Sequence, residues 1–430
     1  MGYLERRRVA CLLLTGCTAT PVQQHRLGNR LMKSLADIVV LDLTHMLSGP
    51  YGAMLLTDLG ARTIKVEPPG TGEGTRQLLA HNRDYSRQGM GAYFLTLNRN
   101  KESVCVDLKS DVGRAVFYDL VRQADVVIDN FSVGVTRRLQ IDHETLAAIN
   151  PRIVTCSISG FGETGPETAR PAFDQVVQGM GGGMSITGTP ASGPVRSGIP
   201  IGDLGGGVFG ALGVLAALVS RNSTGQGQHV DVSMLDVQIS LLNYMATMYL
   251  MSGIVPERLG NGHFVHVPYN TYRTQTNHII IACIGDAFFK QILEVFDRPE
   301  LRDERYLRQP ARLADKALID RVIEEELLTG SADHWLAKLR AARIPCAPVN
   351  DFEQALDDTQ VKARNMVVEV TLQSGDKVKM PGNPIKFSGA TEEPFTAPPL
   401  LGEHTDAVLR NFLRYSSEQV ATLRQTGAVQ

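Results

Sequence analysis

The sequence lacks most of the features that would mark a specialised or non-globular protein. Its 430 residues include 6 cysteines, 1 tryptophan and 6% aromatic residues. Lys and Arg number 43 against 45 Asp and Glu, so the formal net charge is -2. This balance provides no general basic field for nucleic acid. We therefore expect no nucleic-acid partner, and an anionic ligand must meet a local group of cations.

Long apolar runs and paired cysteines are also scarce. The apolar stretch 208–219 is shorter than the roughly 18 residues of a membrane span, so we expect no membrane association and a cytoplasmic location. The cysteines are scattered, with no CxxC pair and no histidine at zinc-ligand spacing, which predicts reduced, mostly buried thiols and no metal site. The length itself suggests two or three domains.

Residues 1–31 do not resemble the rest of the chain. Three arginines at 6–8 precede a six-residue apolar run, and Leu-Thr-Gly-Cys at 14–17 resembles a lipoprotein cleavage box. The apolar run is shorter than that of a signal peptide, and the segment is poor in serine for a transit peptide. We favour an upstream extension ahead of a start at Met32.

From residue 38 the pattern alternates strand and helix. We expect strands at 38–43, 62–67, 104–108, 125–128 and 153–158, and helices at 50–59, 111–123 and 143–149. This alternation predicts a parallel α/β sheet with helices on both faces. Ligands of such sheets bind beyond the carboxyl ends of the strands, which here carry the loops after residues 43, 67 and 128.

The second half of the chain does not continue the alternation of strand and helix. We expect a helix at 208–220, a strand start and one long apolar helix within 229–250 that is a buried connector or a dimer face, and a smaller α+β domain beyond residue 252. That domain has a predicted strand at 278–283 and helices at 287–296, 316–328 and around Trp335. Five prolines make 381–399 an extended linker, and a final helical pair follows, with Ser417 as N-cap and Gly427 just past the end.

Two glycine-rich motifs allow more than one interpretation. Gly205–Gly210 matches GxGxxG, with Asp231 downstream, but no strand leads directly into it, and the same small residues could let a helix pack closely. Asp203 lies between glycines at the entry to the apolar helix, where the helix dipole favours its ionised form. It is either an ordinary N-cap or a carboxylate nucleophile with space for an acyl group, and the pattern alone does not decide.

Other polar residues are ambiguous one by one. Asp174, after Phe173, is an acid or base or a turn former, and we favour the turn former. Five cations fall near strand ends, namely His45, Lys101, Lys109, Arg137 and Arg138. Each alone is a solvated charge, but together they suit a ligand that bears phosphate.

Six segments together resemble a known family. They are VLDLTHMLSGPYGAMLLTDLGARTIKVE (40–67), LNRNKESVCVDLK (97–109), ADVVIDNFSVGVTRRL (124–139), NPRIVTCSISGFGETGP (150–166), GDLGGG (202–207) and PPLLGEHTDAVL (398–409). In this order they resemble the class III CoA-transferases, the family of formyl-CoA transferase and carnitine CoA-transferase. The resemblance covers residues 35–430.

The resemblance implies an intertwined homodimer. Each chain would have an α/β, Rossmann-like large domain with a parallel sheet, built from both termini, and a smaller α+β domain. The implied division is an extension at 1–31, the large domain at 32–228, a connector helix at 229–251, the small domain at 252–380, a linker at 381–399 and a C-terminal return to the large domain at 400–430.

The resemblance also implies roles for individual residues. Asp203 takes the place of the nucleophilic aspartate. Coenzyme A, as a thioester substrate and not a permanently bound cofactor, would contact His45, Leu47, Ser48, Val106, Lys109, Asn130, Phe131 and Arg138, with Phe173 and Asp174 lining the same pocket. The backbone N–H groups of 181–183 or 205–207 are candidates to stabilise the tetrahedral oxyanions.

Departures from the family pattern bear on the substrate. Leu47 replaces a glutamine and Pro68 an arginine, and the tetraglycine loop of formyl-CoA transferase has no counterpart in 252–269, which argues against oxalate. Phe173 stands where the related α-methylacyl-CoA racemases carry a histidine base, which argues against racemisation.

The segment 262–269 and the C-terminal PPLLGEHT are most similar to members that use succinyl-CoA with a second dicarboxylate of the glutarate, malate, citramalate or itaconate type. Arg76, Arg87, Arg196 and His263 are candidates to bind its second carboxylate.

Overall fold

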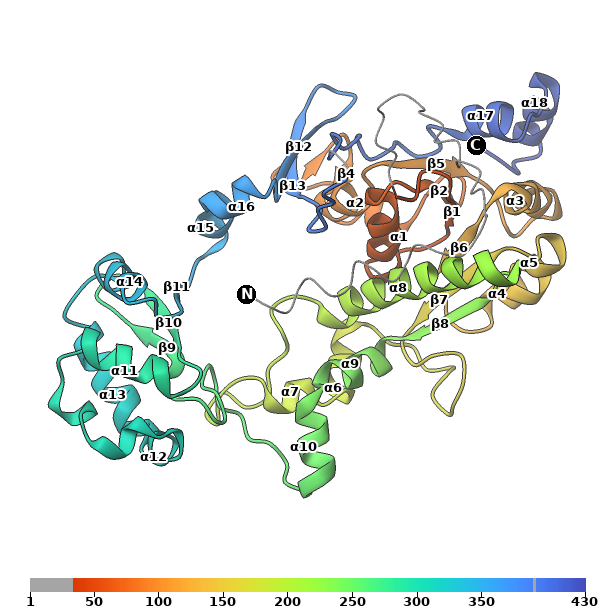
Figure 1. Ribbon diagram of the computed structural model, residues 1–430. Helices are drawn as coiled ribbons and strands as arrows, with labels where there is room; N and C mark the ends of the chain where they lie inside the picture. The colour runs from red at the N-terminus through yellow and green to blue at the C-terminus, as the bar shows by residue number, and fades with distance from the viewer. Residues whose placement is uncertain (1–33, 390–391) are drawn as a thin grey trace, which may run out of the picture.

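The computed structural model describes residues 34–389 and 392–430 (Figure 1). Its centre is a six-stranded parallel sheet in the order β5-β2-β1-β6-β7-β8. The strands are β1 Val39–Asp42, β2 Arg62–Glu67, β5 Lys101–Cys105, β6 Val126–Asp129, β7 Val154–Ser159 and β8 His229–Ser233. The predicted α/β architecture is confirmed, whereas the extension at 1–31 lies outside the described residues.

The strand predicted at 104–108 is misplaced by three residues. β5 begins at Lys101, a charged residue that a pattern of apolar residues does not include. Its ammonium group lies inside the protein and donates to Asp42 Oδ2 at 2.8 Å. Asp42, the partner that allows this charge to be buried in a strand, lies 59 positions earlier in the sequence.

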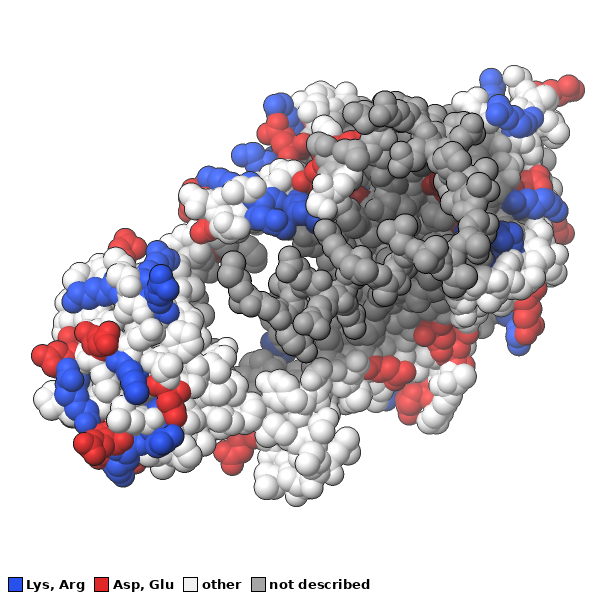
Figure 2. All heavy atoms as spheres, in the orientation of Figure 1, with Lys and Arg blue, Asp and Glu red and all other residues white. Residues whose placement is uncertain are grey.

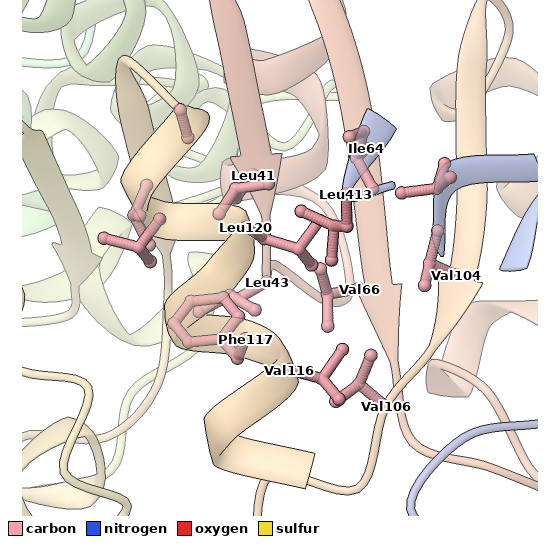
Figure 3. Close-up of a cluster of buried hydrophobic side chains, with 14 of the residues drawn as sticks. Leu41, Leu43, Ile64, Val66, Val104, Val106, Val116, Phe117, Leu120 and Leu413 are labelled. Atoms are coloured by element: carbon pink, nitrogen blue, oxygen red, sulfur yellow. The ribbon is translucent and has the colours of Figure 1, made fainter. Parts of the chain in front are cut away.

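Helices cover both faces of the sheet, as predicted. α3 Asp111–Gln123 and α5 His143–Ile149 have the predicted bounds. Figure 3 shows Val116, Phe117 and Leu120 of α3 packed on the side chains of β1, β2 and β5. On the other face lie α1 Ser48–Asp58 and α8 Ile201–Thr224, which pack against each other, α1 on β1, β2 and β6 and α8 on β7 and β8.

The C-terminal segment returns to this sheet. It forms α17 Thr405–Ala407, a π-helical turn at Val408–Phe412 and α18 Ser417–Gln425. Val408, Leu409 and Leu413 belong to the core under α3. Val429 pairs with Val106, and Asp107 N donates to Ala428 O at 2.9 Å. The two ends of the described chain therefore share one hydrophobic core.

The capping residue of α18 differs from the prediction by one position. Ser416, not Ser417, accepts a hydrogen bond from Gln419 N, and the Gln419 side chain accepts one from Ser416 N. This reciprocal pair is a capping box, and only Ser416 has a glutamine three residues later. Gly427 follows the helix with φ 72°, as expected for a residue just past a C-cap.

A smaller body with its own core follows α10 Tyr244–Ser252 (Figure 1, left). Its antiparallel sheet has the order β11-β10-β9, with β9 Tyr269–Arg273, β10 His278–Ala282 and β11 Cys346–Pro348. Its helices include α11 Asp286–Val295, α12 Gln309–Ala314, α13 Lys316–Leu327 and α14 Ala332–Ala341. α15 Phe352–Asp357, α16 Thr359–Ala363 and the hairpin β12 Val367–Thr371 and β13 Lys377–Pro381 lead back to the large sheet.

The single long helix predicted within 229–250 is wrong. The chain forms α9 Met234–Leu242 and a separate α10, because Asn243 adopts φ 47° and its side chain accepts a hydrogen bond from Tyr244 N. Nor is α10 buried: Leu250 is 79% and Met251 84% exposed. No charged residue interrupts α10, and it projects below the large body as an uncharged surface (Figures 1 and 2).

Within the described residues, α8 is the one helix whose length and composition would let it cross a membrane.

α8 starts at Ile201, seven residues before the predicted start, because its glycines fit against neighbouring elements. A Cβ on Gly207 would lie 2.5 Å from Ser48 O of α1, and one on Gly210 would lie 2.6 Å from Ile158 Cδ1 of β7. The GxGxxG match is thus a helix-packing surface and not a dinucleotide-binding loop.

Candidate active site

A cavity of about 250 Å³ opens at the carboxyl ends of β1, β6 and β7. Its walls are the loops after these three strands, the first residues of α1 and of α9, the start of α8 and a residue of α2 Ala92–Leu97. Six of the residues implied by the family resemblance line it, namely His45, Ser48, Asn130, Phe131, Phe173 and Asp203. The sequence motifs that carry these residues are spread over 159 positions, and the parallel sheet brings them to one edge.

Asp203 lies in the first turn of α8. The N-cap of this helix is Pro200, so the interpretation of Asp203 as an ordinary N-cap is wrong. Burial, followed by the negative charge of Asp174, raises the pKa of Asp203 to about 6. The helix terminus therefore does not decide the pKa of Asp203, because desolvation and the charge of Asp174 outweigh it, and its own contribution stays a prediction.

The carboxylate of Asp174 occupies the N-terminus of α8. Asp174 opens α6 Asp174–Met180, and its Oδ1 accepts hydrogen bonds from Gly202 N at 2.8 Å and Asp203 N at 3.3 Å. Asp174 is thus part of a helix and not a simple turn former. Its carboxylate satisfies the first free N–H groups of α8 and holds the backbone of the candidate nucleophile.

A reciprocal hydrogen bond joins two loops of the cavity. Asn130 Oδ1 accepts from His45 N at 2.9 Å, and Asn130 Nδ2 donates to His45 O at 2.7 Å. The rings of His45 and Phe131 are 5.6 Å apart. Burial and the nearby Lys65 ammonium lower the pKa of His45, so its imidazole is neutral at pH 7.

A buried group of charges supports the turn after β1. The Asp42 carboxylate lies 2.8 Å from Lys101 Nζ and 3.7 Å from Lys65 Nζ, and Lys65 Nζ donates to Thr44 O at 2.7 Å. Although burial opposes it, these two ammonium charges hold the pKa of Asp42 below its ordinary value. Lys101 is therefore not one of the solvated cations available to a phosphate; it anchors the turn that carries His45.

Asp174, which the resemblance also places in this pocket, does not line the cavity, and neither do the other four implied residues. Leu47 and Val106 are buried, and the Val106 side chain belongs to the core under α3. Lys109 and Arg138 are exposed. Contact of these four with coenzyme A stays a prediction, and for Val106 it would involve the backbone.

Two residues of the cavity have no motif in the sequence. Tyr93 reaches it from α2, and burial together with the negative charges of Asp203 and Asp174 raises the pKa of its hydroxyl. Arg170 is the only Lys or Arg among its described lining residues. Its guanidinium pairs with Glu167 at 3.1 Å and lies over the Phe161 ring.

None of the four cations proposed to bind a second carboxylate lines the cavity. Arg76 is 4% exposed, and its Nε lies 2.7 Å from Glu67 Oε2, so it is committed to an internal ion pair. Arg87 and Arg196 are exposed, and neither lines the cavity. His263 lies in the segment before the small body, where its ring packs against Phe264 at 4.5 Å.

The structure narrows the glycine N–H groups that are candidates to stabilise an oxyanion. The N–H groups of 205–207 lie inside α8, where they donate to carbonyls four residues earlier, so they cannot form an oxyanion hole. Gly181 N donates to Val177 O at 2.8 Å. Gly182, the N-cap of α7 Gly183–Ile186, and Gly183, its first residue, are the remaining candidates, although neither lines the cavity. Glycines 205–207 make room for α1, α9 and β7, not for an acyl group.

The described residues contain no cluster of three or more His, Cys, Asp or Glu side chains that could hold a metal ion. Cys105, Cys156, Cys283 and Cys346 are free thiols, the first three of them buried, as predicted. Cys11 and Cys17 lie outside the described part of the chain.

Comparison with known proteins agrees with this geometry. Residues 35–405 match CoA-transferase family III. The chain is 41% identical to an acetyl-CoA:oxalate CoA-transferase of Acetobacter aceti (87% of this chain, 95% of the relative). It is 37% identical to a succinyl-CoA:mesaconate CoA-transferase of Haloarcula hispanica (88% and 96%) and 31% identical to the human succinyl-CoA:glutarate CoA-transferase (93% and 90%). A crystal structure of a CAIB/BAIF family protein from Brucella suis superposes with a TM-score of 0.79 at 36% identity, covering 89% of this chain and all of the other.

The chain therefore belongs to CoA-transferase family III. It is a CoA-transferase, and the family inferred from its motifs is confirmed. The oxalate relative weighs against the expectation that a missing tetraglycine loop excludes oxalate.

Proposed function

We propose that the protein transfers CoA from succinyl-CoA to another dicarboxylic acid through an aspartyl-CoA thioester on Asp203. The observation that carries the proposal is the half-buried carboxyl of Asp203, whose pKa is raised to about 6, in a cavity lined by five of the ten residues that the family resemblance assigns to coenzyme A. Relatives named for transfer between succinyl-CoA and mesaconate or glutarate support the substrate class.

The reaction proceeds through carboxylate and thiolate attack. An Asp203 oxygen attacks the thioester carbonyl, the carbon–sulfur bond breaks, and a mixed anhydride and CoA thiolate form. The thiolate attacks the Asp203 carbonyl and releases succinate, which leaves aspartyl-CoA. An acceptor carboxylate then attacks aspartyl-CoA, and the thiolate, released again, attacks the acceptor's carbonyl and regenerates the Asp203 carboxylate. Every intermediate keeps an activated acyl group, so no ATP is consumed.

The residues of the cavity fit these steps. At pH 7 most of Asp203 is ionised, and its raised pKa makes it a better nucleophile than a solvated aspartate. The Tyr93 hydroxyl is a donor in the cavity for a tetrahedral oxyanion, whereas Gly182 and Gly183 do not line this cavity. Arg170 supplies a cation for the free carboxylate of a diacid.

A second candidate is transfer between acetyl-CoA and oxalate. The relative that is 41% identical over 379 residues carries that name. Oxalate is also a diacid, so the same cation could bind its second carboxylate.

The substrate experiment compares these candidates directly. The protein is incubated with succinyl-CoA or acetyl-CoA and each diacid from oxalate to the six-carbon acids, and new thioesters are measured by mass spectrometry. We expect the highest kcat/KM for succinyl-CoA with a C4 to C6 diacid. Preferred use of acetyl-CoA and oxalate would establish the second candidate, and α-proton exchange without any acceptor would indicate a racemase.

The nucleophile is tested by chemical trapping. After mixing with acyl-CoA, hydroxylamine or borohydride should modify Asp203 and no other residue. Asp203→Asn should lower kcat by at least about 10³-fold, the order found when a catalytic nucleophile is removed. A modified residue elsewhere would refute the assignment.

We also infer that the active unit is a homodimer in the cytoplasm. Family resemblance supports the dimer, and so does the exposed apolar surface of α10 and the residues that follow it. Leu250, Met251, Ile254 and Val255 are all at least 67% exposed in the single chain.

A further inference from the structure

Gln178 is a buried polar residue of α6, one turn after Asp174. Its side chain is 3% exposed, and both ends of its amide are used. Nε2 donates to Asp174 Oδ2 at 2.7 Å, and Oε1 accepts from Ser197 N at 2.9 Å. Only this orientation of the amide pairs each donor with an acceptor. Gln178 does not line the cavity that contains Asp203.

The hydrogen bonds continue from Gln178 to the nucleophile. The second oxygen of Asp174 accepts from Gly202 N and Asp203 N, so a fixed Asp174 carboxylate fixes the first turn of α8. Helices α6 and α8 are in close contact at this point, because a Cβ on Gly202 would lie 2.7 Å from Val177 Cγ2. A displaced Asp174 would therefore displace the backbone of Asp203.

The other end of this network is the segment before α8. Ser197 lies three residues before the N-cap Pro200, and the same loop begins beside Gly188, whose carbonyl accepts from Gly260 N at 2.9 Å. Thr189 O accepts from Arg258 Nε at 3.3 Å. The loop 188–199 is therefore held at both ends. Gln178 binds its end at Ser197, and the segment that leads to the small body binds its beginning at Gly188 and Thr189.

We propose that Gln178 is a positioning residue of the transferase, which sets the place and the charge environment of Asp203 by holding Asp174. This inference rests on the proposed role of Asp203 as the nucleophile. Because Gln178 does not line the cavity, its removal should reduce kcat and leave KM for the acyl-CoA almost unchanged.

Gln178→Glu provides a test that depends on pH. A protonated glutamic acid can donate to Asp174 and accept from Ser197, as the amide does, whereas an ionised one repels the Asp174 carboxylate. Burial and that carboxylate raise the pKa of such a glutamate, so it loses its proton as the pH rises through the neutral range. The ratio of wild-type to variant kcat should grow from within about threefold at pH 6 to about 10- to 100-fold at pH 9, the cost of a misplaced reacting group.

Two further variants complete the experiment. Gln178→Met cannot form either hydrogen bond, and its kcat should fall about 10- to 100-fold at every pH, with KM within about threefold. Gln175→Glu, at an exposed position of the same helix, should match the wild type. A pH-independent ratio for Gln178→Glu, or a wild-type kcat for Gln178→Met, would overturn the proposal.

The trapping assay separates this inference from the proposed function. If the wild type forms no adduct on Asp203, the proposed mechanism fails. If the wild type forms it and Gln178→Met forms it at the same rate, only the role of Gln178 fails.

Discussion

At the scale of single residues, the charge state of Asp203, the proposed nucleophile, should set the pH range of catalysis. In the proposed mechanism the attacking carboxylate must be ionised, and the pKa of Asp203 is raised to about 6. We expect kcat/KM to rise with pH through about 6 and to level off above 7. Asp174→Asn removes the second cause of the raised pKa, so the midpoint of this rise should move to lower pH. A pH–rate profile measures both, and an unmoved midpoint in the variant would contradict the role given to Asp174.

The same carboxyl should reduce stability. The pKa of Asp203 is raised in the folded state from 3.8 to about 6, so the folded protein binds this proton more tightly than the unfolded chain. Folding is therefore penalised above pH 6, and the penalty disappears as the pH falls from 6 to 3.8. Asp203→Asn, which carries no charge, should melt at a higher temperature than the wild type at pH 8, and the difference should shrink at pH 5. Thermal denaturation at the two values tests this.

Tyr93 should contribute through its hydroxyl. It lines the cavity with Asp203, whose charge helps raise the pKa of the phenol. Tyr93→Phe removes the donor of the proposed hydrogen bond to the oxyanion, worth about 1 kcal/mol, so kcat should fall roughly fivefold. The melting temperature should stay close to that of the wild type, and an unchanged kcat would remove Tyr93 from the reaction.

Sequence reasoning found residues that belong to long motifs and missed those that do not. Asp203 was found because glycines flank it and because the surrounding motif matches a family. Tyr93 and Arg170 lie on a short helix and an irregular loop, where position in the fold, and not local pattern, decides what they face. The raised pKa of Asp203 has no signal in the sequence, because its main cause is burial in the folded chain and its second cause is a carboxylate 29 residues away.

At the scale of secondary-structure elements, the contact of α1 with α8 depends on two glycines. A Cβ on Gly207 would meet Ser48 O at 2.5 Å, and one on Gly52 would meet Gly207 O at 2.8 Å. Gly207→Ala should therefore destabilise the protein by about 1–3 kcal/mol, the usual cost of overpacking.

The matched control for this prediction is Gly179→Ala in α6, where the nearest atom to a Cβ is Met184 Sδ at 3.8 Å. Because alanine favours helices, this variant should be at least as stable as the wild type. Denaturant unfolding of both variants compares them, and equal stability would show that α1 and α8 can separate at no cost.

Most elements were predictable because each has a local signal. The amphipathic spacing and the Ser110 cap define α3 to the residue. The predicted start of α8 was late because glycines are poor helix formers in isolation, and only contacts with α1 and β7 make them favourable here. The break at Asn243 gave no proline or glycine signal in the sequence.

At the scale of the whole molecule, the exposed surface of α10 predicts association. We expect a particle of about twice the 46.9 kDa chain mass by light scattering at micromolar concentration. A double substitution, Leu250→Glu with Met251→Glu, should convert it to monomers and reduce activity in proportion, because charges would have to be buried.

Val112→Glu, at an exposed apolar position of α3, is the control and should leave the dimer intact. A wild type that stays monomeric at these concentrations would contradict the proposed assembly.

The return of the C-terminal segment to the sheet also bears on biosynthesis. β5 is the edge strand of the large sheet, and Ser103 O accepts from His404 N at 2.9 Å while Cys105 N donates to Thr405 Oγ1 at 3.2 Å. The ribosome makes this covering segment some 300 residues after β5. Until then the nascent chain carries an uncovered strand edge, the kind of surface that pairs wrongly with other chains. Completion of the sheet is therefore a late event in synthesis, which makes chaperone protection of the nascent chain valuable to this protein.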